Sequence, residues 1–420
     1  MKQSPISRRS FLATTAALAA TGTGAVAASR KRIALIGTMV RRLSHAQHFL
    51  DRLLLGYAWQ GGWRTPDVEL VALYIDQFPD GDLARTTAQK HHVPIYPTIA
   101  EALTRGTSKL AVDGVVIIGE HGQYPRNEKG QTLYPRYRFF KQVIEVFEAS
   151  GRSVPVFNDK HLSTNWNECV EMVEDSRRLG FPFLAGSSLP VTWRLPAVDV
   201  PFGAPLVESV CVGYGGVDSY DFHGLETAQC MSERRRGGEV GIRSVEALRG
   251  PRMWQRLAES KTTPRLLLAA LSRSQSLPVE HGYLTEPISI DWARGHFANA
   301  LAYFIEHRDG FRTTLFMMPV IQDFNYAGRI EGTDEVISCQ MYLPMPGRAA
   351  STAEFFNPLI RQIEQMIVDR RAPYPVERTL LTSGMTLSAV ESLHRDGARI
   401  ETPEMAVRYT APREPLFWRT

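Results

Sequence analysis

Short apolar runs alternate with amphipathic stretches along the first 160 residues of the chain. The apolar runs predict strands at 32–37, 67–76, 112–122 and 154–160, and a short strand or an extended piece at 93–98. The amphipathic stretches between them predict helices near 45–58, 84–92, 99–106 and 137–151. Apolar strands that alternate with helices are typical of a parallel, doubly wound sheet, so the pattern predicts an α/β fold here.

The pattern changes after residue 160, where strand-like segments follow one another with few helices between them. Strands are predicted at 207–216, 237–248, 296–310, 311–320, 324–332 and 336–344. Residues 308–312, which read RDGFR, predict a hairpin turn between two of these strands. The sequence therefore predicts a second, α+β domain with a large, mostly antiparallel open sheet. Two helices interrupted at Pro373 and Pro375 and an extended tail end the chain.

The N-terminus carries the most specific short signal. Twin arginines, Arg8 and Arg9, precede an apolar stretch of small residues and the triplet Ala25-Val26-Ala27. This order predicts a twin-arginine export signal over residues 1–28, which makes the export machinery a partner and the location periplasmic or otherwise extracytoplasmic. A retained N-terminal anchor is the alternative.

The composition and the net charge limit the classes of partner that the protein is expected to bind. With 44% hydrophobic and 22% charged residues, the chain is typical of globular proteins. The formal net charge is +4, and it falls to about +1 once the three positive charges of the signal are removed. Neither nucleic acid nor a membrane surface is therefore an expected partner. The four cysteines are scattered without a C-x-x-C pair, so a cysteine zinc site is not expected.

The carboxyl ends of the predicted strands identify candidate binding residues. Parallel α/β sheets bind ligands beyond the carboxyl ends of their strands. The residues that this rule places on one rim are Gly37, Asp76, Glu120, His121, Asp159 and Lys160.

The first turn departs from the usual dinucleotide fingerprint G-x-G-x-x-G. Gly37 is present, but Thr38 and Met39 follow it, and Arg42 stands where the third glycine is expected. A methionine side chain at this point crowds a pyrophosphate that rests on the helix N-terminus. Arg41 or Arg42 could instead hold phosphate by charge.

Over roughly residues 31–409, the chain resembles the family of glucose–fructose oxidoreductase, inositol dehydrogenase and rhizopine-catabolism proteins (Gfo/Idh/MocA). The segments that carry the resemblance are the turn at Gly37, VALYID (71–76), PTIAEAL (97–103), VDGVVIIG (112–119) and the last helix with its tail (373–403). The resemblance implies a Rossmann-like domain at 29–160, a C-terminal α+β domain at 161–375 for substrate and oligomerisation, and a returning helix and tail at 376–420 that pack on the first domain. It also implies a homo-oligomer formed through the C-terminal sheet, to which apolar side chains of 311–320 would contribute.

The same resemblance implies catalytic residues. Lys160, within Asp159-Lys160-His161, corresponds to a lysine that reaches the nicotinamide and the substrate hydroxyl, and the adjacent Asp159 is a further catalytic candidate. His223, in the segment SYDFHGLE, corresponds to the family's proton acceptor. Glu226, three residues later on the same helix, could orient the imidazole. The alternatives are a rim lysine in a salt bridge, a core histidine, and a metal site built on the His223–Glu226 pair.

The implied cofactor is NAD or NADP, and Asp76 would favour NAD by its place at the end of the second strand. The cofactor-binding candidates are Gly37, Thr38, Met39, Asp76, Glu120 and His121. A divalent metal is the alternative cofactor, with candidate ligands Glu120, His121, Asp159, His161, His223 and Glu226.

The expected function is therefore that of an exported NAD(P)-dependent oxidoreductase acting on a sugar, cyclitol or related carbohydrate. Lys160 and His223 would handle the hydroxyl proton, and the aromatic and polar segment after Glu120 suits sugar binding. The alternative is a family member without redox activity, a lyase, hydratase, isomerase or hydrolase that has lost dinucleotide binding. A protein that only binds its ligand is the third hypothesis.

Overall fold

The structure is a computed structural model that describes residues 29–343 and 352–417. The export signal expected at 1–28 lies outside the described residues. From Lys31 onward the chain forms one compact unit. None of the described helices combines the length and the apolarity that crossing a bilayer requires. The four cysteines, Cys169, Cys211, Cys230 and Cys339, are buried and unpaired.

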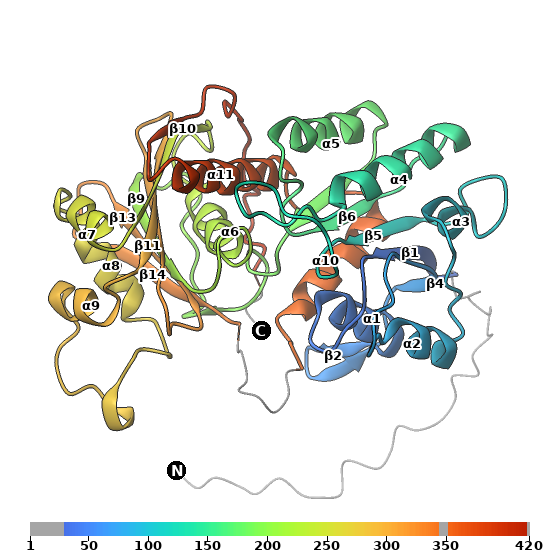
Figure 1. Cartoon of the computed structure of the whole chain (residues 1–420), viewed down its shortest axis with the longest axis horizontal. Helices are drawn as coiled ribbons and strands as arrows, with labels where there is room; N and C mark the ends of the chain where they lie inside the picture. Colours follow the sequence, from blue (N-terminus) through green and yellow to red (C-terminus); the bar gives the residue numbers. More distant parts are fainter. Residues whose placement is uncertain (1–28, 344–351, 418–420) are drawn as a thin grey trace, which may run out of the picture. The chain divides into compact units, whose positions relative to one another are not determined.

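Five parallel strands form the first sheet, in the order β4-β1-β5-β6-β7 (Figure 1). The strands are β1 (Lys31–Gly37), β4 (Val68–Ile75), β5 (Gly114–Ile118), β6 (Val156–Asp159) and β7 (Phe183–Gly186). Every residue of β5 and β6 is buried, as continuous apolar runs predict for strands covered on both faces. The predicted doubly wound sheet is confirmed, and its last strand lies beyond residue 160.

Helices from both ends of the chain cover this sheet. The apolar side chains of α1 (His45–Leu55) and α10 (Phe356–Asp369) share one core with the first face of the sheet. The opposite face packs against α3 (Ile99–Thr104), α4 (Arg136–Ser150) and α5 (Trp166–Arg178). Helix α2 (Ala84–His91) adds two alanines to the first core. The first sheet is thus completed by a helix from the last fifth of the chain.

Eight strands form the second sheet, in the order β15-β10-β11-β12-β9-β13-β14-β8. The strands are β8 (Arg194–Leu195), β9 (Leu206–Gly213), β10 (Ile242–Arg249), β11 (Leu301–His307), β12 (Arg312–Met317), β13 (Phe324–Ile330), β14 (Val336–Met341) and β15 (Ile400–Glu401). Strands β9 and β12 pair in parallel, and all other neighbours are antiparallel. The predicted hairpin at 308–312 joins β11 to β12.

Both faces of the second sheet are covered by helices of the same chain (Figure 1). The helices are α6 (Asp221–Ser232) and α11 (Glu377–His394) on one face, and α7 (Pro251–Ala258), α8 (Thr263–Leu271) and α9 (Ile290–His296) on the other; η1 is the short 3-10 helix Glu280–Gly282. The expectation that 311–320 offers an open apolar face was wrong for most of that segment. Leu315 packs towards α6, and Phe316 packs towards α7 and α8, so neither faces solvent.

Some predicted element boundaries were also wrong. Residues 93–98 form no strand and contribute one bridge between Ile95 and Leu73. The first helix ends at Leu55 because Gly56 takes a positive φ of 84°, which glycine adopts at little cost. The next eight residues form a small hairpin, β2 (Tyr57–Trp59) and β3 (Gly62–Arg64), that the sequence did not predict.

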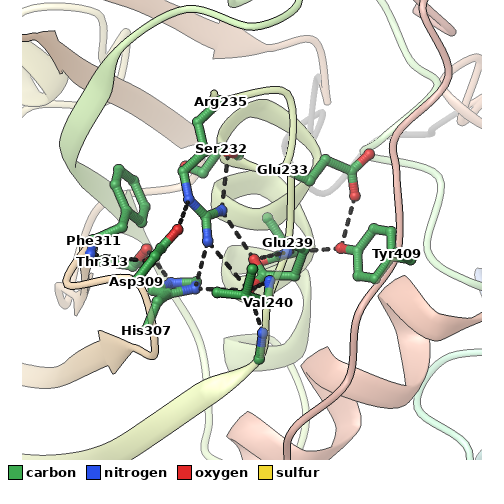
Figure 2. Close-up of polar contacts among 12 residues, drawn as sticks. Ser232, Glu233, Arg235, Glu239, Val240, His307, Asp309, Phe311, Thr313 and Tyr409 are labelled. Carbon is green, nitrogen blue, oxygen red and sulfur yellow. Dashed lines mark hydrogen bonds and ion pairs between the residues drawn. The ribbon is translucent and has the colours of Figure 1, made fainter. Parts of the chain in front are cut away.

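The C-terminal tail is fastened by a buried polar network at the end of α6 (Figure 2). Glu239 accepts hydrogen bonds from Arg235, from Gln229 and from two backbone amides, and it lies 3.2 Å from Nδ1 of His307. The hydroxyl of Tyr409 donates to Glu233 at 2.8 Å. These polar contacts act together with apolar packing, because Met405 and Tyr409 of the tail also belong to the core on the α6 face of the second sheet.

Candidate active site

The predicted rim exists, because the carboxyl ends of β1, β4, β5 and β6 lie side by side. Asp159 is the last residue of β6, and Lys160 follows it with a positive φ of 69°. His121, two residues after Gly119, has a φ of 63°. Left-handed backbone at non-glycine residues is uncommon and concentrates at functional sites, because it costs free energy that only a defined surrounding structure maintains.

Lys160 and His223 converge, as the sequence analysis expects. The Nζ atom of Lys160 lies 2.9 Å from Nε2 of His223 and 3.3 Å from a carboxylate oxygen of Glu120. An amine that is bonded to a carboxylate donates, so Nε2 of His223 is the acceptor in this contact. Burial first, and the nearby charge of Lys160 second, hold the pKa of His223 well below its usual value of 6.5. The imidazole is therefore neutral at neutral pH.

The first turn of α6 holds His223 in place. The carboxylate of Asp221 accepts hydrogen bonds from the backbone amides of Asp218, Ser219 and Phe222 and from the hydroxyl of Tyr303. Acidic side chains at a helix N-terminus satisfy amides that have no partner inside the helix. The Nδ1 atom of His223 is buried without a hydrogen-bond partner among the described residues. The imidazole is thus positioned by the helix and by packing, and it uses Nε2 alone.

Glu226 does not orient His223, which corrects the expectation from their spacing. Its carboxylate turns to the other side, where it accepts hydrogen bonds from the hydroxyl of Thr382 at 2.7 Å and from the amide of Ser187 at 3.3 Å. Residues three apart on a helix are neighbours only when both side chains point along the same face. Here α11 and the end of β7 provide the donors, so Glu226 is part of the packing between α6 and α11.

Replacing Glu226 by Gln is expected to change how stability depends on pH. Burial raises the pKa of Glu226 to about 7 from its usual 4.5. The folded state therefore binds a proton that the unfolded state has lost, and wild-type stability falls by about 3 kcal/mol as pH rises from 4.5 to 7. The Glu226→Gln protein has no such proton. Urea unfolding at several pH values measures the difference, and parallel pH profiles for the two proteins would contradict this assignment.

A second cluster lies beside the Lys160–His223 pair. Nδ1 of His45, the first residue of α1, lies 2.8 Å from Oδ2 of Asp159 and 3.7 Å from Oε1 of Glu120. His121 approaches the same Glu120 oxygen at 3.3 Å. Burial alone would raise the pKa of Glu120, but His45 and Lys160 outweigh it and hold this carboxyl ionised. Sequence analysis missed His45, although a histidine at the start of the first helix of such a sheet faces the rim.

A cleft of about 720 Å³ opens above these residues. His45, Glu120, Lys160 and His223 line it. Its aromatic wall comes from the second half of the chain, with ring centroids of Tyr214 and Tyr220 5.0 Å apart and those of Tyr214 and Phe324 5.2 Å apart. Apolar ring faces beside hydrogen-bonding groups suit the alternating C–H and O–H groups of a sugar ring.

Some side chains of the segment expected to bind sugar make hydrogen bonds within the protein. Tyr124 donates its hydroxyl to Asp76 at 2.7 Å, and Gln131 donates to Asp218 at 3.1 Å. Neither residue lines the 720 Å³ cleft. His121 of the same segment does line that cleft, and Gln123 and Tyr134 line a neighbouring cleft of about 790 Å³, so sugar binding by this segment stays a prediction.

The metal ligand set inferred from the fold was also wrong in part. His161 lies 2.9 Å from Arg136 and 3.4 Å from Asp218, and burial first, then Arg136, keep its pKa well below the usual value. Among the described residues, the group with the spacing of metal ligands consists of Glu120 and Asp159 with His45. His121, His161, His223 and Glu226 are not in this group.

The candidate cofactor-binding residues all lie near the first turn, but several of them already make hydrogen bonds or close contacts within the protein. Thr38 donates its hydroxyl to the backbone oxygen of Glu120, which ties β1 to β5. The two carboxylate oxygens of Asp76 accept hydrogen bonds from Tyr74 and Tyr124. Gly37 has room for little beyond its hydrogen, because an added Cβ would lie 3.2 Å from Ile75. Met39 lines a second cleft, of about 790 Å³.

The N-terminus of α1 is occupied by the protein itself. The backbone amide of His45 donates to Oε1 of Glu120 at 3.2 Å. In dinucleotide-binding folds, this end of the first helix holds the pyrophosphate by its free amides and its positive dipole. A phosphate placed there would meet the ionised carboxylate of Glu120. The carboxylate of Glu120 would therefore compete with a phosphate for this helix end.

Solved structures share this fold. GenD2 from gentamicin A biosynthesis, in complex with NAD, superimposes with a TM-score of 0.56 at 14% identity, over 89% of this chain and 96% of GenD2. A myo-inositol dehydrogenase from Lactobacillus casei, in complex with NAD(H) and myo-inositol, gives 0.54 at 12% identity, over 89% and 97% of the two chains. A myo-inositol dehydrogenase from Corynebacterium glutamicum gives 0.51 at 13% identity, over 89% and 99%.

These likenesses confirm the predicted two-sheet fold and, at the level of fold, the resemblance to Gfo/Idh/MocA dehydrogenases. No protein-family model matches the sequence, and no curated protein matches it. Identities of 12–14% show the fold alone, so the chemistry has to be argued from the side chains of this chain.

Proposed function

We propose that this protein is an enzyme of the oxidoreductase kind that acts on a hydroxyl group of a sugar, cyclitol or related carbohydrate. The observation that carries the proposal is the contact of 2.9 Å between Lys160 and His223 at the base of the 720 Å³ cleft. One group donates, the other accepts, and both line the cleft. The solved structures of the same fold include dehydrogenases in complex with NAD and with NAD(H) and myo-inositol, which supports a carbohydrate as substrate.

A substrate hydroxyl would replace the direct contact of 2.9 Å between the two residues, because the single acceptor lone pair of Nε2 cannot receive the lysine and the hydroxyl at once. Lys160 then donates to the substrate oxygen, whose own hydrogen is directed at Nε2 of the neutral His223. As the carbon–oxygen bond gains carbonyl character, the proton moves to Nε2 and Lys160 stabilises the charge that develops on oxygen. Glu120 keeps the lysine in position through its contact of 3.3 Å.

A nicotinamide dinucleotide fits these residues only with its phosphates away from the helix end. The 790 Å³ cleft along the ends of β1 and β4 meets the substrate cleft at Arg41 and His121, which line both. The guanidinium of Arg41 would hold the phosphates by charge, and Met39, Gln77 and Phe78 would line the remainder. NAD or NADP, when bound, supplies a hydride acceptor.

The non-redox alternative has one observation in its favour. The carboxylate of Glu120 takes the anion-binding end of α1, a position that a dinucleotide-binding protein of this fold normally leaves to phosphate. With the same Lys160 and His223, the cleft could support elimination, hydration or isomerisation at a carbon beside the hydroxyl.

The two reactions are separated by one experiment. Purified protein is denatured and its released small molecules are identified by mass spectrometry, and a panel of sugars and cyclitols is then incubated with NAD⁺, NADP⁺ or neither. Released nucleotide, or absorbance at the wavelength of reduced nicotinamide, supports the oxidoreductase. Product formed without nucleotide supports the alternative. If no compound of the panel is converted, with or without nucleotide, and no nucleotide is released, both enzymatic hypotheses are refuted and the protein that only binds its ligand remains.

We also propose that residues 1–28 direct export by the twin-arginine route, on the basis of Arg8, Arg9 and the Ala25-Val26-Ala27 triplet. Cell fractionation of the wild-type chain and of a chain with both arginines replaced by lysine tests this. Wild-type protein that stays in the cytoplasm would contradict it.

A further inference from the structure

We infer that His45, Glu120 and Asp159 form a binding site for a divalent first-row transition metal ion at the floor of the substrate cleft. Their ligand atoms all lie within 4.8 Å of one another. One imidazole and two carboxylates are ligands that Zn²⁺, Mn²⁺ and Fe²⁺ accept. The inference does not depend on which reaction the cleft supports.

The spacing of the three groups suits a single ion. Ligands bound at about 2.1 Å lie about 3 Å apart when they are neighbours around the ion and about 4 Å apart when they are opposite. Nδ1 of His45 is 2.8 Å from Asp159 and 3.7 Å from Glu120. Both distances lie near the range expected for two ligands of one ion.

The carboxylate of Asp159 supports the site independently. It is fully buried at the end of β6, yet its Oδ1 atom has no hydrogen-bond partner among the described residues. Buried polar atoms in native proteins are almost always bonded, and a buried charge without a partner costs several kcal/mol. The hydrogen bond to His45 satisfies only Oδ2. A cation between the histidine and the carboxylates would supply the missing partner.

The position of His45 and Glu120 in the cleft would let a bound cation contact the substrate. His45 and Glu120 line the cleft, so coordination positions not filled by protein remain open to substrate oxygens. Glu120 presents Oε1 to His45 and Oε2 to Lys160, and its carboxylate therefore separates the ion from the lysine. The rings of His45 and His223 have centroids 6.2 Å apart. One hydroxyl of a sugar would bind the ion while a neighbouring hydroxyl contacts the Lys160–His223 pair.

The test measures the ion itself. Protein purified without chelators is expected to contain about one equivalent of Zn, Mn or Fe by elemental mass spectrometry. After treatment with chelator, titration with MnCl₂ or ZnCl₂ should show one saturable site by calorimetry, and MgCl₂ should bind more weakly. A wild-type protein that contains no stoichiometric metal and binds neither Mn²⁺ nor Zn²⁺ would overturn the inference.

Three variants locate the site. Asp159→Asn, which preserves shape, and His45→Gln should each weaken Mn²⁺ binding by about 100-fold or more and alter the electron paramagnetic resonance spectrum of bound Mn²⁺. Lys160→Met retains all three ligands and should bind Mn²⁺ at least as tightly as wild type, since it removes a nearby positive charge. Unchanged affinity in Asp159→Asn protein that is folded by circular dichroism would show that the ion binds elsewhere. Loss of turnover in Lys160→Met protein with its metal retained would separate the proposed reaction from the metal site.

Discussion

Replacing Lys160 by Met is expected to reduce kcat/KM by about 10²- to 10⁴-fold, the usual contribution of a positioned proton donor or acceptor. The substitution removes the amine that donates to the substrate oxygen and leaves the aliphatic chain that fills the floor of the cleft. Replacing His223 by Gln should have an effect of similar size, because an amide does not accept the hydroxyl proton. Most of the loss should appear in kcat, since both groups act on charge that develops during the reaction.

The double variant makes the prediction specific to the pair. If Lys160 and His223 act on one hydroxyl, combining Lys160→Met with His223→Gln should cost little more than either change alone, because residues that act as a unit are not additive. Lys109→Met and His394→Gln, both at exposed positions, are matched controls and should keep wild-type rates. Turnover at the wild-type rate in either single site variant would remove that residue from the proposed mechanism.

The architecture could be read from the sequence because its signals are local and repeated. Apolar runs separated by amphipathic stretches predicted the parallel sheet, and the carboxyl ends of its strands predicted the rim that holds Glu120, Asp159 and Lys160. The hairpin at 308–312 followed from its turn residues. Such rules act over a few residues, and for this reason one sequence is enough to apply them.

The failures concern contacts between distant segments. A spacing of three residues placed His223 and Glu226 together on α6, but packing of α11 drew Glu226 to Thr382, 156 residues away. A donor from a distant helix pairs with Glu226, because a buried carboxylate has to be satisfied by whatever donors lie nearest. In the loop after Glu120, Tyr124 likewise donates to the half-buried Asp76, a contact that no local pattern predicts.

His45 is a site residue that the sequence did not predict, because its role also depends on contacts between distant segments. In the sequence it is one of eleven histidines, within a turn that had already lost its dinucleotide fingerprint. Only the fold shows that it faces Asp159, 114 residues later. At the helix end where dinucleotide-binding folds hold phosphate, this chain lacks the second and third glycines and brings an imidazole together with carboxylates.

Replacing Glu239 by Gln should destabilise the protein by about 3–5 kcal/mol, the cost of removing one partner from a buried ion network. Glu239 is buried and receives charged hydrogen bonds from Arg235 at 3.0 and 3.2 Å (Figure 2). His307, which is also fully buried, lies 3.2 Å away. Without the carboxylate, Asp309 at 2.8 Å is the one charged partner that Arg235 retains within the described part of the chain. Urea unfolding followed by circular dichroism measures the change in the midpoint.

The pH dependence of that loss identifies its cause. Burial alone would raise the pKa of Glu239, but His307 and Arg235 outweigh it and hold the pKa far below the usual 4.5. The stabilisation is therefore present above pH 4.5 and lost as pH falls below it, so wild type and Glu239→Gln should differ most near pH 6–7 and converge in acid.

Glu331→Gln, which removes an exposed partner 3.8 Å from Arg236, is the control and should cost less than about 1 kcal/mol. A pH-independent difference would instead point to lost packing. Unfolding of Glu239→Gln at the wild-type midpoint would mean that the tail and α6 are held together by apolar contacts and not by this network.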